Sequence, residues 1–494
     1  MRVGNLRWIA ALLLSVPATE QAQTIAVASY PVTRPSTGGP NAITVGPDGA
    51  VWFTVGSGSI GRMTAASVGT LYPIPTKSSS PSGITVGPDG ALWFTEYAAN
   101  QIGRITTNGT FTEYPVPTAN SGPFGITAGP DGALWFTEYT ANQIGRITTT
   151  GAITEYRNVY GAEPEAITAG PDGALWYTEY IQVARITTSG AETNYQVTST
   201  SYSPQGITMG PDGALWFTGA NQIGRITTTG AVTEYPTYGS QPQAIATGPD
   251  GALWFTDSYS NTIGRINTAG AVSNYPAPPT SYYNTGTTGI SNGPDGALWF
   301  TEYGAGWVGL ALFTTASLTA NPQGLPSGSS ISFNGSGFDA NETVEIYKNG
   351  IGSAVLTTGV ANSSGSFNAG ATNGVPVAPF GYRLFLAVGE TSKKIGAAAF
   401  STTPYLSFTF PNGEQAGNPI TVSGSGFAPF DSVQVYWDNP LTLLGTTTAD
   451  ITGAFSGSAA VTGTIPASAV GQNYVTGVGV NVPQAKDARG VNLQ

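Results

Sequence analysis

The sequence GPDGALWFTEY at residues 87–97 contains the motif on which most of the chain is built. Near copies bring the total to seven, with the motif aspartate at Asp48, Asp89, Asp131, Asp172, Asp212, Asp250 and Asp295. Neighbouring copies are 38 to 45 residues apart, which is the length of one four-stranded propeller blade. The repeat therefore predicts a seven-bladed β-propeller.

The repeat at residues 124–164 shows why each copy should form four strands. Its Pro-Asp-Gly turn reverses the chain, because Pro presets a turn φ and Gly tolerates positive φ. The segment after the turn is nearly all apolar, as expected of a strand buried on both faces. The four strands that we expect in this repeat are residues 126–128, 133–137, 144–147 and 153–156.

The last repeat lacks a fourth strand after residues 307–313. Residues 25–33 at the other end of the chain read like the fourth strand at residues 111–117. We expect this N-terminal strand to complete the last blade, because its pairing would remove an open sheet edge. The predicted propeller spans residues 25–313.

Residues 1–22 read as a signal peptide. A short basic segment precedes an apolar run at residues 8–16, and Ala18 and then Ala22 are the candidate cleavage points. No later stretch reaches the ~18 apolar residues that a membrane helix needs. We therefore expect a bacterial protein that is secreted or periplasmic, monomeric and without a membrane span.

The composition excludes several classes of function. The chain of 494 residues has 67 Gly, 35 Pro and 9% charged residues, which suits a turn-rich all-β protein. It has no Cys and no His, so disulfides, Ser-His-Asp or Cys-His catalysis and imidazole metal ligands are excluded. A net charge of −11 would repel a phosphate backbone, so nucleic acid is not an expected partner.

A second duplication follows the propeller. The sequence ISFNGSGF at residues 331–338 matches ITVSGSGF at residues 420–427. Each copy has the size of one β-sandwich, with short alternating strands and frequent turns. The copies resemble bacterial immunoglobulin-like modules, which we expect at residues 315–403 and 404–485. A role as spacers that hold the propeller away from a surface is the simplest expectation.

One face of the predicted ring carries acidic and aromatic residues that follow the second strand of five repeats. These candidate ligand-binding residues are Glu96, Tyr97, Glu138, Tyr139, Glu179, Tyr180, Asp257, Tyr259, Glu302 and Tyr303. Around the mouth of a central channel they would suit a cation, a polar ligand or a sugar. The alternative is that they finish the strand and solvate the rim. The motif aspartates are interpreted as turn formers, and the third-strand arginines as stacking near the repeat Trp.

The motifs Gly-Pro-Asp-Gly-x-Leu-Trp-Phe-Thr-Glu, Asn-Gln-Ile-Gly-Arg-Ile and Thr-Glu-Tyr-Pro recur in this order over residues 25–313. Together they resemble the virginiamycin B lyase family of streptogramin lyase propellers. The resemblance implies an enzyme that opens type B streptogramin rings by elimination, with Mg²⁺ and a His base. Gln243 and Thr288 occupy the positions of the two family histidines, and Asp257 occupies that of a family Glu.

Only a carboxylate remains at these positions, and loss of a general base costs a factor of about 10² to 10⁴. We therefore predict no catalytic residues and no cofactor, with Mg²⁺ needed only if lyase activity is retained. The predicted role is that of a ligand-binding or surface-interaction protein whose partner is a small molecule, a glycan or a cell-envelope component. The alternatives are a lyase that uses Asp257 with a replaced base, and a purely structural cell-envelope protein.

Overall fold

The computed structural model describes residues 24–32, 38–64, 69–158, 162–197, 204–237, 240–277, 286–321, 324–325, 329–348, 353–372, 381–402, 404–427, 431–438, 441–450, 454–466, 471–479 and 486–493. The predicted signal peptide lies outside these residues. Within them, none of the helical segments has the length and hydropathy to span a membrane.

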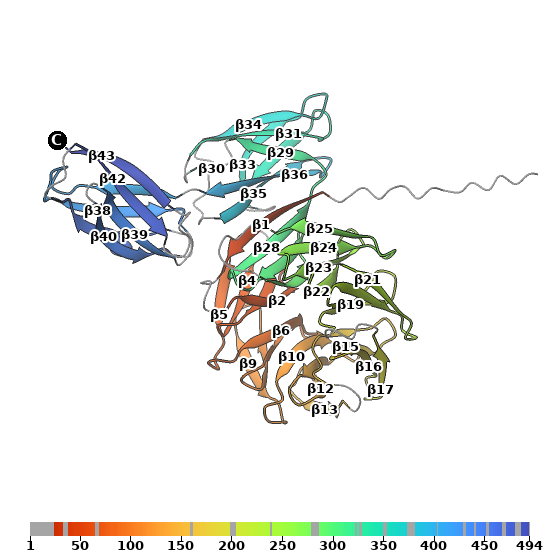
Figure 1. Cartoon of the computed structure of the whole chain (residues 1–494). Coiled ribbons are helices and arrows are strands. Elements are labelled where there is room, and N and C mark those ends of the chain that lie inside the picture. The colour runs from red at the N-terminus through yellow and green to blue at the C-terminus, as the bar shows by residue number, and fades with distance from the viewer. Residues whose placement is uncertain are drawn as a thin grey trace, which may run out of the picture.

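Seven four-stranded antiparallel sheets form the propeller (Figure 1). Blades 1 to 3 contain β2 (Pro40–Val45), β3 (Val51–Val55), β4 (Ser59–Met63), β5 (Gly69–Pro73); β6 (Pro81–Val86), β7 (Leu92–Glu96), β8 (Gln101–Ile105), β9 (Phe111–Pro115); and β10 (Pro123–Ala128), β11 (Leu134–Glu138), β12 (Gln143–Ile147), β13 (Ile153–Arg157). Blades 4 to 6 contain β14 (Ile167–Ala169), β15 (Leu175–Glu179), β16 (Gln182–Ile186), β17 (Glu192–Gln196); β18 (Ile207–Met209), β19 (Leu215–Gly219), β20 (Gln222–Ile226), β21 (Val232–Pro236); and β22 (Pro242–Thr247), β23 (Leu253–Asp257), β24 (Thr262–Ile266), β25 (Val272–Pro276).

Blade 7 is closed by the N-terminal strand, as the sequence predicts. It contains β26 (Thr287–Asn292), β27 (Leu298–Glu302) and β28 (Trp307–Phe313), and β1 (Ile25–Pro31) is its outer strand. β1 pairs with β28 along its whole length, from Ile25 opposite Phe313 to Pro31 opposite Trp307. Strands from opposite ends of the propeller sequence therefore share one sheet, and β1 covers the edge that β28 would otherwise leave open.

The second strand of each blade is buried on both faces, because a blade packs between two neighbours. In blade 2 the side chains of β7 are all buried, and Trp93 stacks on Tyr114 of the outer strand at 5.5 Å between ring centroids. Phe94 fills the space above Gly103, where an added Cβ would come within 2.1 Å of the ring. A glycine at this point of the third strand is thus required by the aromatic ring beside it.

The motif aspartate connects the turn to the rest of its blade. Asp89 Oδ1 accepts the indole N–H of Trp93 at 2.9 Å, and Oδ2 accepts the Nε–H of Arg104 at 2.7 Å. The same ion pair forms in blades 1 to 6. The arginine is therefore bound primarily by the carboxylate, and the guanidinium carbon of Arg104 lies 5.9 Å from the Trp93 ring. The sequence analysis identified the turn and the stacking but not this ion pair.

The C-terminal part forms two further units, each made of two sheets around its own apolar core. The first unit contains β29 (Ser317–Asn321), β30 (Gly324–Leu325), β31 (Ile331–Ser336), β32 (Thr343–Tyr347), β33 (Val355–Val360), β34 (Phe367–Ala371), β35 (Gly381–Gly389) and β36 (Ile395–Thr402). The second contains β37 (Tyr405–Thr409), β38 (Pro419–Ser425), β39 (Ser432–Asp438), β40 (Leu441–Thr448), the short 3-10 helix η1 (Gly457–Ala459), β41 (Val461–Thr464), β42 (Gly471–Gly479) and β43 (Lys486–Leu493). Their assignment as immunoglobulin-like stays a prediction.

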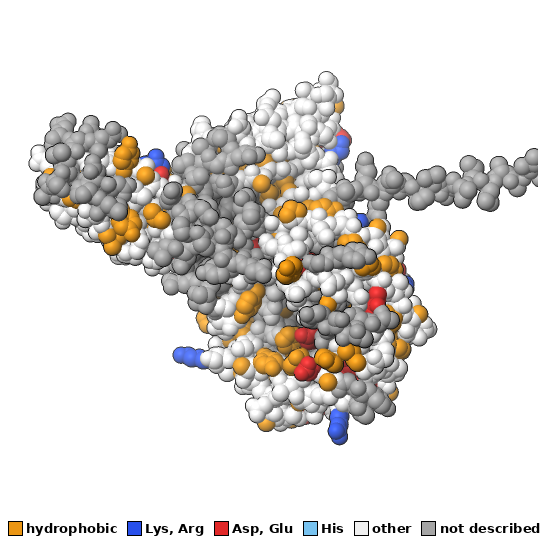
Figure 2. All heavy atoms as spheres, viewed as in Figure 1, with side chains coloured by type: hydrophobic (Ala, Val, Ile, Leu, Met, Phe, Trp, Pro, Cys, Tyr) orange, Lys and Arg blue, Asp and Glu red, His pale blue; other side chains and the backbone are white. Residues whose placement is uncertain are grey.

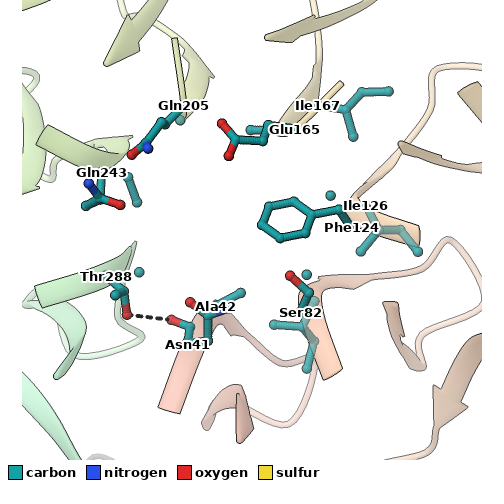
Figure 3. A pocket seen from close by; sticks show the side chains of 17 residues that line it. Asn41, Ala42, Ser82, Phe124, Ile126, Glu165, Ile167, Gln205, Gln243 and Thr288 are labelled. Carbon is teal, nitrogen blue, oxygen red and sulfur yellow. Dashed lines mark hydrogen bonds between the residues drawn. The ribbon is translucent and has the colours of Figure 1, made fainter. Parts of the chain in front are cut away.

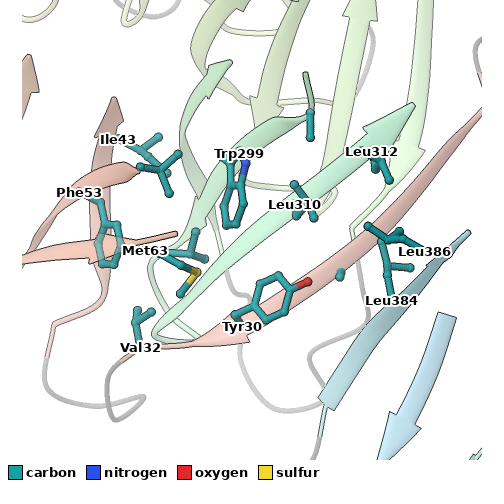
Figure 4. Packing of buried hydrophobic residues seen from close by; sticks show 14 of the residues in the cluster. Tyr30, Val32, Ile43, Phe53, Met63, Trp299, Leu310, Leu312, Leu384 and Leu386 are labelled. Carbon is teal, nitrogen blue, oxygen red and sulfur yellow. The ribbon is translucent and has the colours of Figure 1, made fainter. Parts of the chain in front are cut away.

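The first C-terminal unit packs against blade 7. Leu384 and Leu386 of β35 belong to the same buried cluster as Tyr30 of β1 and Leu312 of β28 (Figure 4). The backbone N–H of Thr315 also donates to the carbonyl of Ile395 at 2.9 Å. Blade 7 therefore buries apolar surface against the first C-terminal unit as well as within the propeller.

Candidate functional site

A cavity of about 280 Å³ lies where the first strands of all seven blades meet. Each blade contributes one residue from the step that opens its first strand, and we call these seven residues the channel ring. They are Asn41, Ser82, Phe124, Glu165, Gln205, Gln243 and Thr288 (Figure 3). Because the residues come from equivalent positions of a repeat, the ring combines six types of side chain on one backbone frame.

The channel ring is held in place by threonines from the buried second strands. In blade 2, Thr95 Oγ1 donates to the carbonyl of Phe124 in blade 3 at 2.6 Å and accepts the N–H of Gly83 in its own blade at 2.9 Å. Thr137 binds Glu165 in the same way, with a donor to acceptor distance of 2.7 Å. In every blade a threonine makes this bond to the next ring residue. The seven positions are therefore fixed relative to one another by buried hydrogen bonds.

Glu165 is the one ionisable residue of the channel ring. Its Oε2 atom is buried and has no hydrogen-bond partner. Burial, and then the neighbouring Glu163, raise the pKa of Glu165 to about 7. A carboxyl group with this pKa changes its charge near neutral pH, so Glu165 can either hold a cation or exchange a proton there. Glu165 was not among the residues predicted from the sequence, although it is the only charged residue at this step of any repeat.

Aromatic rings lie next to Glu165 in the wall of the cavity. Phe124 of the channel ring contacts Tyr97 edge to face, with 6.3 Å between centroids, and Tyr139 at 5.9 Å. Burial of Tyr139, and then the neighbouring Glu163 and Glu165, raise the pKa of its hydroxyl. Acidic side chains also lie beside hydrophobic ones over the propeller in Figure 2. Aromatic and acidic groups therefore meet at one side of the channel.

The five carboxylates that the sequence analysis proposed as ligand contacts lie inside the blades. Glu96, Glu138, Glu179, Asp257 and Glu302 are at most 1% exposed, and none of them lines the cavity. Burial, and then the carboxylate of Glu155 on the outer strand, raise the pKa of Glu138 to about 8. Burial, and then Glu113 on the outer strand, likewise raise the pKa of Glu96 to about 8. The four glutamates meet the outer strand of their own blade, through Glu113, Glu155, Asn194 and Ser29.

The tyrosines that follow these carboxylates lie at the surface. Tyr97, Tyr180, Tyr259 and Tyr303 are exposed and Tyr139 is half-buried. None of the five lines the cavity directly, but Tyr97 and Tyr139 contact its wall through Phe124. The acidic and aromatic members of each pair therefore have different surroundings, and only the aromatic members can meet a ligand outside the blade.

The positions that match the family site separate into two groups. Gln243 and Thr288 belong to the channel ring, whereas Asp257 does not. Asp257 Oδ1 accepts the backbone N–H groups of Gln241, Tyr259 and Ser260 at 3.0 to 3.2 Å, so it holds its own loop. Across the described ranges, no group of three acidic side chains converges as metal ligands. Mg²⁺ prefers six oxygen ligands. The groups that contact Asp257 Oδ1 are backbone N–H groups, which do not meet that requirement.

These observations define a seven-bladed β-propeller protein with a central cavity built from equivalent repeat positions. The chain belongs to the Virginiamycin B lyase family, whose sequence profile matches residues 25–236 and 163–318. The resemblance noted from the repeat motifs is thereby confirmed. No curated protein matches the chain.

Solved structures of lyases resemble the propeller part. A streptogramin B lyase structure is 37% identical, with 59% of this chain and 98% of that chain covered and a TM-score of 0.55. Selenomethionine-substituted virginiamycin B lyase from Staphylococcus aureus is 38% identical, with 59% and 100% covered and a TM-score of 0.55. A catalytically inactive variant of that enzyme, with quinupristin, is 39% identical at the same coverage and TM-score.

Proposed function

We propose that the propeller binds a small polar ligand in the channel-ring cavity and does not perform the lyase reaction. The observation that carries the proposal is the ring itself, because seven side chains of six different types line one cavity. Six of them are uncharged. The volume of the cavity, about 280 Å³, is close to the lower end of the volumes of known ligand pockets, roughly 300 Å³.

The same ring argues against the family reaction. Gln243 and Thr288 stand where the resemblance places the catalytic histidines, and the chain has no His anywhere. Neither an amide nor an aliphatic hydroxyl accepts a proton at neutral pH, so neither replaces a general base. Gln243 Nε2 instead donates weakly to the carbonyl of Gln241 at 3.5 Å.

One observation favours the alternative of a lyase with a replaced base. The pKa of Glu165, raised to about 7 by burial and then by Glu163, lies in the range that suits a general base. Glu165 and Gln243 lie on either side of Gln205 in the same cavity (Figure 3). In this alternative Glu165, rather than Asp257, would abstract the proton, because Asp257 is buried in its loop.

We also propose that the protein works outside the cytoplasm, on the basis of the signal-like sequence at residues 1–22. The two C-terminal units would then hold the propeller away from a cell surface. A glycan or another cell-envelope component is the kind of partner that this location offers.

The test uses the mature protein with quinupristin, which is present in the solved structure of a relative. Binding is followed by calorimetry and ring opening by mass spectrometry, with and without Mg²⁺. We expect no ring opening, and binding of quinupristin or of a cell-wall oligosaccharide that Ser82→Phe abolishes by filling the cavity. Absence of binding by all of these ligands would contradict the proposal.

Two controls separate the two functions. Virginiamycin B lyase from Staphylococcus aureus serves as the positive control for ring opening. If the present protein opens the ring and Glu165→Gln stops it, the lyase alternative is correct. Glu390→Gln, which removes an exposed carboxylate of the first C-terminal unit, is the matched control for loss of one negative charge.

A further inference from the structure

Five side chains from blades 2 to 4, at the end of the blades where the cavity lies, form a group that we call the cation corner. They are Tyr97, Phe124, Tyr139, Glu163 and Glu165. Phe124 and Glu165 line the cavity from neighbouring blades, and the two tyrosines contact the Phe124 ring. Aromatic faces beside carboxylates are the surroundings in which proteins recognise organic ammonium groups.

The corner carries acidic charge that the repeat's own arginines do not neutralise. Arg104, Arg146 and Arg185 of blades 2 to 4 are each bound to the motif aspartate of their own turn. Those turns join the first and second strands, so they lie at the other end of the blades from the cavity steps. Within the part of the chain that the structure describes, Glu165 Oε2 is buried without a hydrogen-bond partner. An unpaired buried carboxylate oxygen is costly unless a ligand completes its bonding.

Backbone strain accompanies this arrangement. Glu163 has a φ of +55°, a left-handed conformation that residues with a long side chain rarely adopt. It immediately precedes Pro164, which fixes the start of the step that carries Glu165. Strained residues of this kind concentrate at ligand sites, where the surrounding structure holds them.

We infer that the cation corner binds the ammonium group of a small organic cation, whose remaining part lies in the channel-ring cavity. This inference rests on the proposed binding function and names the class of ligand. Phe124, supported by the tyrosines, offers its ring to the cation, and Glu165 supplies the counter-charge. Gln205 and Gln243, farther round the ring, offer amides to polar groups of the same ligand.

Binding of such a cation depends on pH. Among the described residues, the groups near Glu165 that carry or can carry charge are Glu163 and Tyr139. With a pKa of about 7, Glu165 is mostly protonated at about pH 6 and mostly ionised at about pH 8. A cation binds the ionised form, so its affinity should rise about tenfold over this range.

The experiment compares choline with dimethylbutanol, the uncharged isostere in which carbon replaces the quaternary nitrogen. Calorimetry on the mature full-length protein measures both affinities at about pH 8. We expect choline to bind at least about tenfold more tightly than the isostere, and Glu165→Gln or Phe124→Leu to weaken choline about tenfold. In Glu165→Gln the dependence of choline affinity on pH should disappear.

Matched variants and a second acidic variant keep the test decisive. Glu390→Gln and Tyr474→Leu, which remove an exposed charge and an exposed ring of the two C-terminal units away from the corner, should leave choline binding unchanged. Should Glu165→Gln unfold, Glu163→Gln at the exposed position beside it serves instead, with an expected weakening of several-fold. Equal affinities for choline and its isostere, or equal losses in the matched variants, overturn the inference.

The outcome also separates this inference from the proposed function. If choline does not bind but an uncharged oligosaccharide does, and Ser82→Phe abolishes that binding, the cavity binds ligands and only the cationic class is wrong. If none of the probes binds, both the proposed function and this inference fail.

Discussion

Arg146 donates its Nε–H to Oδ2 of Asp131 at 2.6 Å. The other oxygen of the same carboxylate accepts the indole N–H of Trp135 at 3.0 Å. One turn carboxylate thus joins the second and third strands of blade 3, since Trp135 and Arg146 are direct partners in the sheet. Blade 7 has the aspartate and the indole bond but places Leu310 opposite its tryptophan.

This difference between blades predicts the effect of removing the carboxylate. Asp131→Ala should lower the free energy of unfolding by about 2–3 kcal/mol, because charge-assisted hydrogen bonds to Arg146 and Trp135 are both lost. Asp295→Ala in blade 7, where Leu310 stands in place of the arginine, should cost about 1 kcal/mol less. Urea unfolding of both variants measures the difference. Equal losses would show that the arginine contributes nothing to stability.

The pairs of motif aspartate and arginine also predict how the stability of the fold changes in acid. Burial acts to raise the pKa of Asp131, but bonds from Trp135 and Arg146 outweigh it, so the pKa is lowered overall from 3.8. A lowered folded pKa contributes stability above the unfolded value, and this stability is lost as the pH falls through the folded value. Melting temperature should therefore drop steeply below about pH 4, and less steeply in Asp131→Asn. Parallel curves for the variant and the wild type would contradict this.

Buried carboxyl pairs predict that the stability of the fold decreases as the pH rises toward alkaline values. Burial, and then Glu155, raise the pKa of Glu138 to about 8, so the folded state binds more protons than the unfolded state between about pH 4.5 and 8. Stability from this site is complete below about pH 4.5 and is lost as the pH rises to about 8. Glu138→Gln should thus match the wild type near pH 5 and melt a few degrees higher near pH 8.5.

Blade 5 provides the control for this prediction. Gly219 ends its second strand where blade 3 has Glu138, while Glu234 occupies the outer-strand position of Glu155. Glu155→Gln should flatten the dependence of melting temperature on pH, whereas Glu234→Gln should have little effect. Equal flattening in both variants would mean that repulsion within the carboxyl pair is not the cause.

The threonines that fix the channel ring predict a coupling between stability and binding. Thr137→Val removes the bond to the Glu165 carbonyl and leaves the N–H of Gly125 without its acceptor. The expected cost is about 2 kcal/mol, because buried polar groups lose their partners. Choline affinity should fall as well, because Glu165 is no longer held. Thr54→Val, which affects the backbone of Ser82 and Ala42 instead, should cost similar stability and leave choline binding nearly unchanged.

The contact between blade 7 and the first C-terminal unit predicts that the two stabilise each other. Leu386→Ala should cost about 2–4 kcal/mol by leaving a cavity beside Tyr30 and Leu312. Hydrogen exchange of the β1 amides should accelerate in this variant. Phe367→Ala in the unit's own core is the control and should leave β1 exchange unchanged. Slow exchange of β1 in Leu386→Ala would indicate that the blade closes independently.

The sequence was sufficient to predict the propeller because its signals are local and repeated. Turn residues, apolar second strands and the period each appear seven times, and the unmatched strand at residues 25–33 indicated the closure that β1 makes with β28. The ligand-binding residues were harder to predict. Glu138 and Tyr139 are adjacent in sequence, yet the first is buried in the blade and the second contacts the cavity wall through Phe124.

By itself, the sequence determined the number of blades, the closure of the ring and the absence of a histidine base at the positions now held by Gln243 and Thr288. The tertiary structure alone decided which side chains share the cavity. Phe124, Glu165 and Gln205 are about forty residues apart in the chain, as the repeat requires, and only circular closure brings them together. Strand periodicity determines which face of a sheet a side chain occupies, whereas convergence on a common axis depends on packing among all seven blades.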